Sequence, residues 1–417
     1  LYVFVNLASV LYLGALALET IMGIPMLYGV IGLSLFAAAY SLYGGLSAVA
    51  WTDVIQVIFL VLGGLVTTYL ALNAVSDGNG VFAGMKTVYE AVPDKFAMIL
   101  DKSNPEYKNL PGLGVLVGGL WVANLYYWGF NQYIIQRTLA AKSLRESQKG
   151  IILAAFLKII IPVIVVVPGI AAYVMVNDPT TMDRLGDLAM NNVPSLDQAD
   201  KAYPWLLQFL PVGLKGVAFA ALAAAIVSSL ASMLNSTSTI FTMDIYRQYI
   251  NPNASSKKTV NVGRMTAAVA LVVSCIMAPL LGGIDQAFQF IQEYTGLVSP
   301  GILAVFILGL FWKKTTNRAA IVGALASIPI ALYFKVGQNG WSDSPLFVDV
   351  PFLDQMGYTC LLTMGIIALV SLRQNNGADD PKGIPLTREL FKTSPKFNIG
   401  AFAALIIISV IYALFWS

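Results

Sequence analysis

Charged residues are scarce in this sequence, and histidine is absent. Of the 417 residues, 11% are charged and 57% are hydrophobic, whereas a soluble domain carries about 25% charged residues. Without histidine, His-based acid–base catalysis and His metal ligands are excluded. The only two cysteines, Cys275 and Cys360, lie in apolar runs, which argues against a disulfide framework or a zinc site. The net charge of +3 provides no basic field for a nucleic acid. The remaining class is a polytopic membrane protein.

Long apolar runs predict an all-α fold with about eleven transmembrane helices. A bilayer core of about 30 Å requires roughly 20 apolar residues in a helix. Sixteen of the 25 Lys and Arg residues fall in one set of alternate connections and eight in the other, while Lys158 falls inside a span. The richer set is therefore assigned to the cytoplasm. The predicted helices cover residues 1–18, 24–42, 53–75, 113–131, 150–176, 213–243, 260–282, 286–312, 317–335, 356–372 and 397–416.

The beginning of the chain is also informative. Leu1 lies at the start of the apolar run 1–18, with neither Met nor a charged segment before it. This run does not have the pattern of a signal peptide. We therefore expect that an N-terminal part of the native protein precedes this chain. No linker indicates a second soluble domain, so residues 1–417 are expected to form a single transmembrane domain.

Lys158 is the strongest functional candidate inside the spans. A lysine at the middle of a membrane costs about 2.5–3.5 kcal/mol, so it requires acceptors in the helix bundle or a wet cavity. We interpret Lys158 as a donor to a polar substrate; the alternatives are snorkelling and a structural ion pair. Pro162 and Pro168 follow on the same helix and can open backbone carbonyls by kinking it.

A second group of candidates lies in the segment LWVANLYYWGFNQ. Asn124, Tyr127 and Trp128 are spaced i, i+3 and i+4, so they share one face of an α-helix. An amide beside aromatic rings suits a sugar, because the amide pairs with hydroxyls and a ring stacks on the apolar face of a pyranose. The alternative is an aromatic belt at the membrane interface, to which Trp121 and Tyr126 are assigned.

Phe288, Gln292 and Glu293 lie in the segment IDQAFQFIQEYTG. Phe288 and Gln292 are four residues apart and face the same way. Gln292 can donate and accept hydrogen bonds to a substrate, or it can bond to a neighbouring helix. Glu293 is a candidate partner for a cation or for Lys158. A break in the helix is expected next, at Gly296, Ser299, Pro300 and Gly301.

The segment 213–243 is rich in small and hydroxyl residues. Ser228 and Ser229 are three and four residues after Ala225, so their hydroxyls and the Ala225 carbonyl can converge on a hard cation such as Na⁺. The alternative is close helix packing through small residues. Asp53 stands at a predicted cytoplasmic helix start, where an acid often acts as a cap. The sharper hypothesis for Asp53 is a role in releasing the cation into the cytoplasm.

Four segments resemble the sodium:solute symporter family. In the last of them, Ala319-Ala320 stands where Gly-Ala is usual. The four segments are GGLSAVAWTDVIQ (44–56), FNQYIIQRTLAAKS (130–143), AALAAAIVSSLASMLNSTSTIFTMDIY (220–246) and GLFWKKTTNRAAIVG (309–323).

The resemblance implies a LeuT-type fold of two inverted five-helix repeats with peripheral helices, and fourteen helices in the full protein. Residues 1–75 would then end the first repeat, 113–312 would form the second, and 317–417 would be peripheral. Three helices would be missing at the N-terminus, including one that supplies part of both ligand sites.

The resemblance also implies site roles. Asn124, Lys158 and Gln292 are similar to residues that bind sugar hydroxyls. Tyr127 resembles the ring that stacks on the sugar, with Trp128 beside it. Phe288 resembles part of the outer hydrophobic gate.

For the ion, Ala225 (through its carbonyl), Ser228 and Ser229 resemble sodium ligands, and Asp53 resembles an acid on the sodium exit path. Within the family, the sugar-transporting members are the nearest in pattern, so galactose or glucose is the expected substrate. Na⁺ is expected as the co-transported ion, with no organic cofactor.

The expected location is the bacterial inner membrane, and the oligomeric state is open, a homodimer included. The alternatives are a family member for another solute (proline, a vitamin or an anion), a membrane sensor with a transporter fold, and a sodium channel.

Overall fold

The computed structural model describes residues 2–282, 287–338, 340–341 and 344–416, and no β-strand occurs among them. Within these ranges, the side chains of residues 2, 42–49, 188, 197 and 288 are outside the description. The α-helices are α1 (Tyr2–Met22), α2 (Met26–Val75), α3 (Val81–Ala91), α4 (Gly112–Val117), α5 (Gly119–Leu125), α6 (Gln132–Leu139), α7 (Leu144–Asn177), α8 (Pro179–Leu185), α9 (Asp187–Met190), α10 (Ala202–Leu207), α11 (Val212–Thr239), α12 (Ser256–Met277), α13 (Ala287–Thr295), α14 (Ser299–Phe311), α15 (Asn317–Gln338), α16 (Phe352–Gln374) and α17 (Pro395–Leu414).

Each of the eleven predicted helices has a counterpart among the described residues. Eight helical segments are long and apolar enough to cross a membrane, and two bent pairs bring the number to ten. The remaining counterpart is the shorter apolar segment Met26–Ser41. The predicted all-α membrane architecture is therefore confirmed by length and composition of the described helices.

The structure differs from the prediction in α2. The sequence predicted two helices, 24–42 and 53–75, but the backbone is helical from Met26 to Val75. The connecting residues 43–52 contain no proline, so every one of them can supply a backbone N–H to a helix. Hydropathy marks where polar residues interrupt an apolar run, and it does not mark where a helix ends.

The predicted span 113–131 is broken in the structure. The helical pieces on either side of Gly118 are bent by 76°, and a π-helical turn, Tyr126–Phe130, follows α5. A Cβ atom on Gly119 would clash with the carbonyl oxygen of Leu353 in α16. Only glycine permits this close approach of the two backbones.

The predicted break after Gln292 is confirmed. α13 ends at Thr295, α14 begins at Ser299, and the two helices are bent by 49°. Pro300 lies in the first turn of α14, where its missing N–H costs no helical hydrogen bond.

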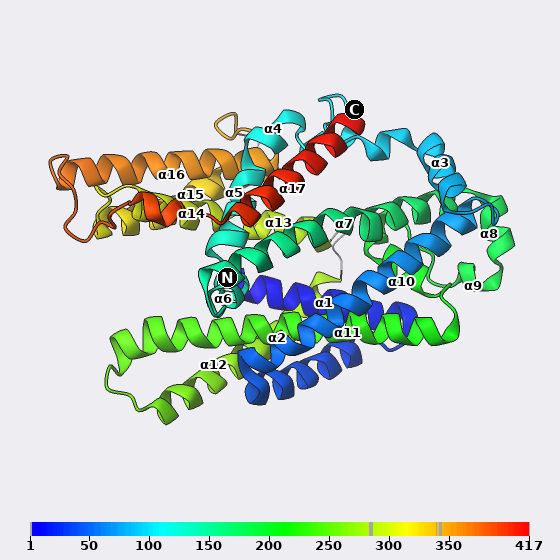
Figure 1. Cartoon of the computed structure of the whole chain (residues 1–417), viewed down its shortest axis with the longest axis horizontal. Helices are drawn as coiled ribbons and strands as arrows, with labels where there is room; N and C mark the ends of the chain where they lie inside the picture. The colour runs from blue at the N-terminus through cyan, green and yellow to red at the C-terminus, as the bar shows by residue number, and fades with distance from the viewer. Residues whose placement is uncertain (1, 283–286, 339, 342–343, 417) are drawn as a thin grey trace. The chain divides into compact units, whose positions relative to one another are not determined.

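The chain forms two compact units: unit 1 comprises Leu1–Phe96 and Phe156–Ile291, and unit 2 comprises Ala97–Ala155 and Gln292–Ser417. In unit 1, α1, α2, α11 and α12 pack against one another (Figure 1). In unit 2, α16 packs against α5, α14 and α15. The inverted repeats with limits at 1–75, 113–312 and 317–417 stay a prediction.

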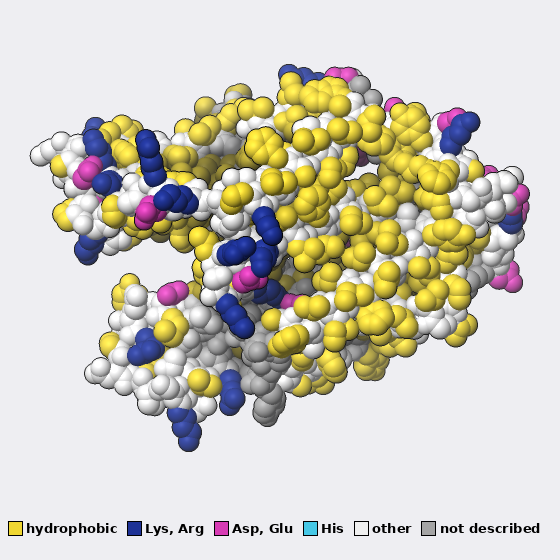
Figure 2. Space-filling view, viewed as in Figure 1, with side chains coloured by type: hydrophobic (Ala, Val, Ile, Leu, Met, Phe, Trp, Pro, Cys, Tyr) yellow, Lys and Arg dark blue, Asp and Glu magenta, His cyan; other side chains and the backbone are white. Residues whose placement is uncertain are grey.

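On the face shown in Figure 2, hydrophobic side chains predominate, and Lys and Arg form small groups among them. α7 and α17 illustrate this composition, since Val165 and Val166 in α7 and Phe402 and Ile406 in α17 are all exposed. Such apolar exposure over whole helices suits contact with lipid chains.

Candidate functional site

The predicted sodium residues come together in unit 1. Ser228 Oγ of α11 donates a hydrogen bond to Asp53 Oδ1 of α2, although the two residues are 175 positions apart. Ser228 is buried, and Asp53 is half-buried. A carboxylate beside a serine hydroxyl inside a membrane helix pair supplies the hard oxygen atoms that a sodium ion prefers. Ser228, the predicted sodium ligand, and Asp53, the predicted exit-path acid, therefore lie in direct contact.

Ala225 and Ser229 lie on the same turn of α11 as Ser228. Both are half-buried, and residues three and four apart on an α-helix share a face. No group of three or more Cys, Asp or Glu side chains that could hold a metal ion occurs among the described residues. In this region the Asp53 carboxylate contacts the Ser228 hydroxyl, and both groups carry hard oxygen atoms.

The predicted sugar residues Asn124, Tyr127 and Trp128 lie in unit 2, where α5 meets the π-helical turn. Asn124 Nδ2 donates to the Leu120 carbonyl at 2.9 Å, which leaves the amide oxygen as an acceptor. Tyr127 Oη is 2.7 Å from Tyr133 Oη, and the Tyr127 and Trp128 rings meet edge to face at 5.2 Å. A π-helical turn is frequent at functional sites. It also alters the α-helical spacing that predicted the shared face of these residues.

The aromatic-belt interpretation has two different outcomes. Trp121 is 59% exposed, as a residue at a membrane interface would be, but Tyr126 is only 7% exposed. The assignment of Tyr126 to the belt was wrong, because Tyr126 lies on the inward side of the helix and packs within unit 2.

Lys158 lies in α7, in unit 1, and its side chain is exposed. α7 continues through Pro162 and Pro168. Because Pro162 has no N–H, the Lys158 carbonyl lacks its usual i+4 donor. Thr68 Oγ1 of α2 donates to the Val163 carbonyl at 2.9 Å. This stretch of α7 thus carries a cationic side chain, and one of its backbone carbonyls is hydrogen-bonded to α2.

Gln292 and Phe288 both belong to α13. Gln292 is half-buried and lies one turn before the break at Gly296. The side chain of Phe288, the predicted outer gate, is outside the described residues. At the start of the same helix, the Asp200 carboxylate accepts a hydrogen bond from Ala287 N at 2.9 Å. Burial raises the pKa of Asp200, and the hydrogen bond from Ala287 opposes that rise.

Sequence reasoning missed one buried cluster. Lys335 was counted with the outer connections, but it is only 3% exposed and forms an ion pair of 2.5 Å with Glu293. Glu293 was expected to pair with Lys158 or a cation, and Lys335 takes that position in the structure. The signal that could have revealed this pair was the position of Lys335 at the very end of the predicted span 317–335.

Apolar helices, with two of them broken beside the candidate ligand residues, define a multi-pass membrane protein of the transporter type. Residues 1–327 match the model of the sodium:solute symporter family. The chain therefore belongs to the sodium:solute symporter family, whose members are transporters that couple a solute to sodium.

Two curated relatives support the same assignment. The chain is 65% identical to the sodium/glucose cotransporter of Vibrio parahaemolyticus over 416 residues, covering 100% of this chain and 75% of that protein. It is 32% identical to human sodium/myo-inositol cotransporter 2, covering 80% of this chain and 50% of that protein. The chain thus spans three quarters of the first relative and about half of the second.

A Na⁺-coupled sialic acid symporter, solved in a substrate-bound outward-open state, is similar in structure. The TM-score is 0.71 at 24% identity, and the likeness covers 89% of this chain and 71% of that chain. It shows the fold, and the predicted LeuT-type fold class is confirmed.

Proposed function

We propose that this protein carries a monosaccharide, galactose or glucose, into the cell together with Na⁺ by alternating access. The observation that carries this proposal is the 65% identity over the whole chain to a sodium/glucose cotransporter. The paired Asp53 and Ser228 and the π-helical turn beside Asn124 supply separate support from the geometry.

In the proposed mechanism, residues of α11 bind sodium and a residue of α2 receives it on release. The Ala225 carbonyl and the hydroxyls of Ser228 and Ser229 coordinate the ion, with further ligands from elsewhere in the protein. Asp53 receives the ion as it leaves, because its carboxylate already accepts the Ser228 hydroxyl. When the cation replaces that hydroxyl beside Asp53, the ion moves toward the cytoplasm and the half-buried carboxylate always keeps a partner.

The sugar half belongs to Asn124, Lys158 and Gln292. The Asn124 amide oxygen accepts a sugar hydroxyl, since one of its N–H groups is engaged with Leu120. Lys158 donates to sugar oxygens, and Gln292 donates and accepts. Amide and ammonium groups of this kind supply the hydrogen bonds that orient a many-hydroxyl ligand.

The gates close each side of this site in turn. The Tyr127 ring stacks on the sugar and closes it from the cytoplasm, with Trp128 at its edge, and Phe288 closes the outer side. Sodium binding from outside favours the outward-open state, and sugar binding then allows the inward transition. Differential affinity of the two states for sodium couples the two flows.

No step of this cycle requires covalent chemistry, so the protein acts as a transporter and not as an enzyme. Its partners are Na⁺, the sugar and the lipid bilayer. Because the relative with the higher identity is bacterial, we place the protein in the bacterial plasma membrane, and a homodimer is one arrangement compatible with that location.

A second candidate is a sodium symporter for another solute. The human relative is a sodium/myo-inositol cotransporter, and myo-inositol is also a ring that carries many hydroxyls. Asn124, Lys158 and Gln292 suit such rings better than they suit proline or an anion, since an anion would require more fixed positive charge.

Uptake by proteoliposomes tests the proposal. The protein is reconstituted and offered labelled galactose, glucose, myo-inositol and proline, with an inward gradient of Na⁺ or, as the control, of K⁺. We expect uptake of galactose or glucose to rise only with the Na⁺ gradient. Equal uptake with K⁺, or Na⁺-driven uptake of proline alone, would overturn the proposed function.

A further inference from the structure

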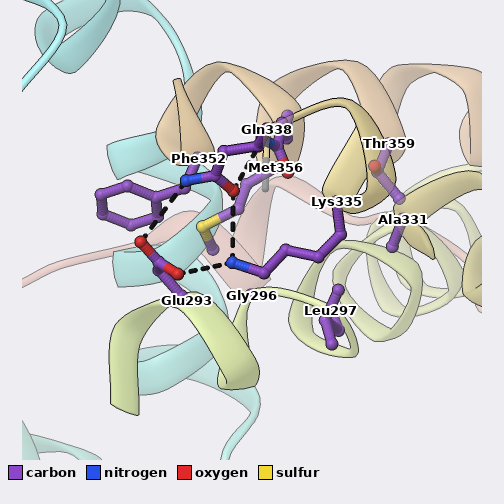
Figure 3. A pocket seen from close by; sticks show the side chains of 10 residues that line it. Glu293, Gly296, Leu297, Ala331, Lys335, Gln338, Phe352, Met356 and Thr359 are labelled. Atoms are coloured by element: carbon purple, nitrogen blue, oxygen red, sulfur yellow. Dashed lines mark hydrogen bonds and ion pairs between the residues drawn. The ribbon is translucent and has the colours of Figure 1, made fainter. Parts of the chain in front are cut away.

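A buried polar cluster in unit 2 joins three helices. It comprises Glu293 of α13, Lys335 and Gln338 of α15, and Gln355 of α16, and its members line one pocket (Figure 3). Lys335 Nζ lies 2.5 Å from Glu293 Oε2 and 3.2 Å from Gln338 Oε1. Gln338 Nε2 donates to Glu293 Oε1 at 3.4 Å, and Gln355 Nε2 donates to Gln338 Oε1 at 2.9 Å.

This cluster is poorly explained as a simple source of stability. Lys335 is 3% exposed and Glu293 18% by side chain, so both charges have lost most of their contact with water. A buried ion pair often contributes no more than hydrophobic residues of similar size. A network in which every member is hydrogen-bonded does, however, favour one arrangement of the helices that carry it.

Two helices with candidate sugar residues depend on that arrangement. Gln292 immediately precedes Glu293 in α13, so a rotation of α13 that moves Glu293 also moves Gln292. On the other side, α16 carries Gln355 two residues after Leu353, whose carbonyl oxygen lies against Gly119 at the start of α5. α5 in turn carries Asn124. The cluster is thus connected to Gln292 directly and to Asn124 through α16.

We propose that the Glu293–Lys335 pair and its two glutamines are positioning residues for the sugar site. They fix the rotation of α13, and hence the direction of Gln292, relative to α16 and α5. This inference rests on the proposed function, because it assumes that Gln292 binds the sugar. Glu293 and Lys335 themselves make no contact with the sugar in this scheme.

The double variant Glu293→Gln/Lys335→Met provides the test. It removes both charges together, so no buried charge is left without a partner and the protein is expected to fold. Melting in detergent checks folding. We expect the KM for sugar uptake to rise about 2- to 12-fold, which corresponds to the loss of one neutral hydrogen bond. Sodium binding measured without sugar should be unchanged, because the sodium residues belong to other helices.

Two further variants sharpen the test. The charge swap Glu293→Lys/Lys335→Glu restores opposite charges across the same pair and should return KM part of the way to the wild-type value. The matched control is Lys108→Met/Asp349→Asn, which removes an exposed ion pair of 2.6 Å in the same unit and should leave KM unchanged, because exposed pairs contribute little.

The results distinguish failure of the positioning role from failure of the proposed function. A folded double variant with the wild-type KM would overturn the positioning role, since a purely structural pair is dispensable once stability is retained. An equal loss of sugar and sodium binding would overturn it as well. Failure of the proposed function looks different, because the wild-type protein measured in parallel would then show no Na⁺-driven sugar uptake.

Discussion

Replacement of Lys158 by Met is expected to lower sodium-driven sugar uptake about 10- to 100-fold, the range for losing a hydrogen bond from a charged donor. Met retains most of the length of the side chain and removes only the charge and the donors. Because the Lys158 side chain is exposed, the substitution should leave folding intact. Initial uptake rates in proteoliposomes, measured at several sugar concentrations, check this prediction.

Controls separate binding from folding in the Lys158 experiment. Lys142→Met alters an exposed lysine outside the spans and should transport normally. Lys158→Ala should behave like Lys158→Met if the charge matters, and the melting temperature of both should resemble that of the wild-type protein. Normal uptake by a folded Lys158→Met variant would remove Lys158 from the sugar site.

Replacement of Ser229 by Ala is expected to raise the sodium concentration for half-maximal uptake about 10-fold or more, taking as a guide the about 1.5–3 kcal/mol of a hydrogen bond to a charged group. Sugar uptake at saturating sodium should be affected much less. The measurement is the initial uptake rate as a function of external sodium, at constant ionic strength and fixed sugar concentration.

The Ser229 test has a rescue variant and a matched control. Ser229→Thr keeps the hydroxyl and should preserve most of the sodium dependence. Ser236→Ala removes a buried hydroxyl two turns further along α11 and should leave it unchanged. An unaltered sodium dependence in Ser229→Ala would show that this hydroxyl is not a ligand.

The sodium region illustrates how far the sequence could lead. The hydroxyl-rich segment of α11 is visible in the sequence, because Ser228 and Ser229 stand one turn after Ala225 in an otherwise apolar run. The sequence marks Asp53 only as an acid near a predicted helix start. That prediction was wrong, because Asp53 lies in the interior of α2. That Ser228 donates to Asp53 depends on the packing of α2 against α11 across 175 residues, which no local pattern records.

Of the two helix breaks, one was predicted from the sequence and the other was not. The break after Gln292 was predictable, because Gly296, Pro300 and Gly301 are all residues that interrupt helices. The break at Gly118 was not predicted, although the Gly118-Gly119 pair is a helix-breaking signal; the packing that requires glycine there comes from α16. Gly119 permits contact with the Leu353 carbonyl, and that partner is more than 200 residues away in the sequence.

Hydropathy did not predict that the charged residue Lys335 is buried. Its position at the end of an apolar run suggested an exposed connection, because helix ends usually reach water. In the structure its partner Glu293 comes from another helix, and the pair becomes buried together. A charged residue at the end of a span can therefore be either a topology signal or half of an internal pair, and only tertiary packing distinguishes the two.

Accumulation of sugar against its own gradient is the most direct measurement of the central claim, that sodium drives sugar uptake. One sodium ion per sugar, at 100 mV inside negative, supports up to about 50-fold accumulation, since moving one charge yields about 2.3 kcal/mol. With an inward Na⁺ gradient, labelled galactose or glucose inside proteoliposomes should exceed the external concentration and return to it when a sodium ionophore is added. Internal sugar that never exceeds the external concentration, or accumulation that survives the ionophore, would contradict sodium-coupled symport.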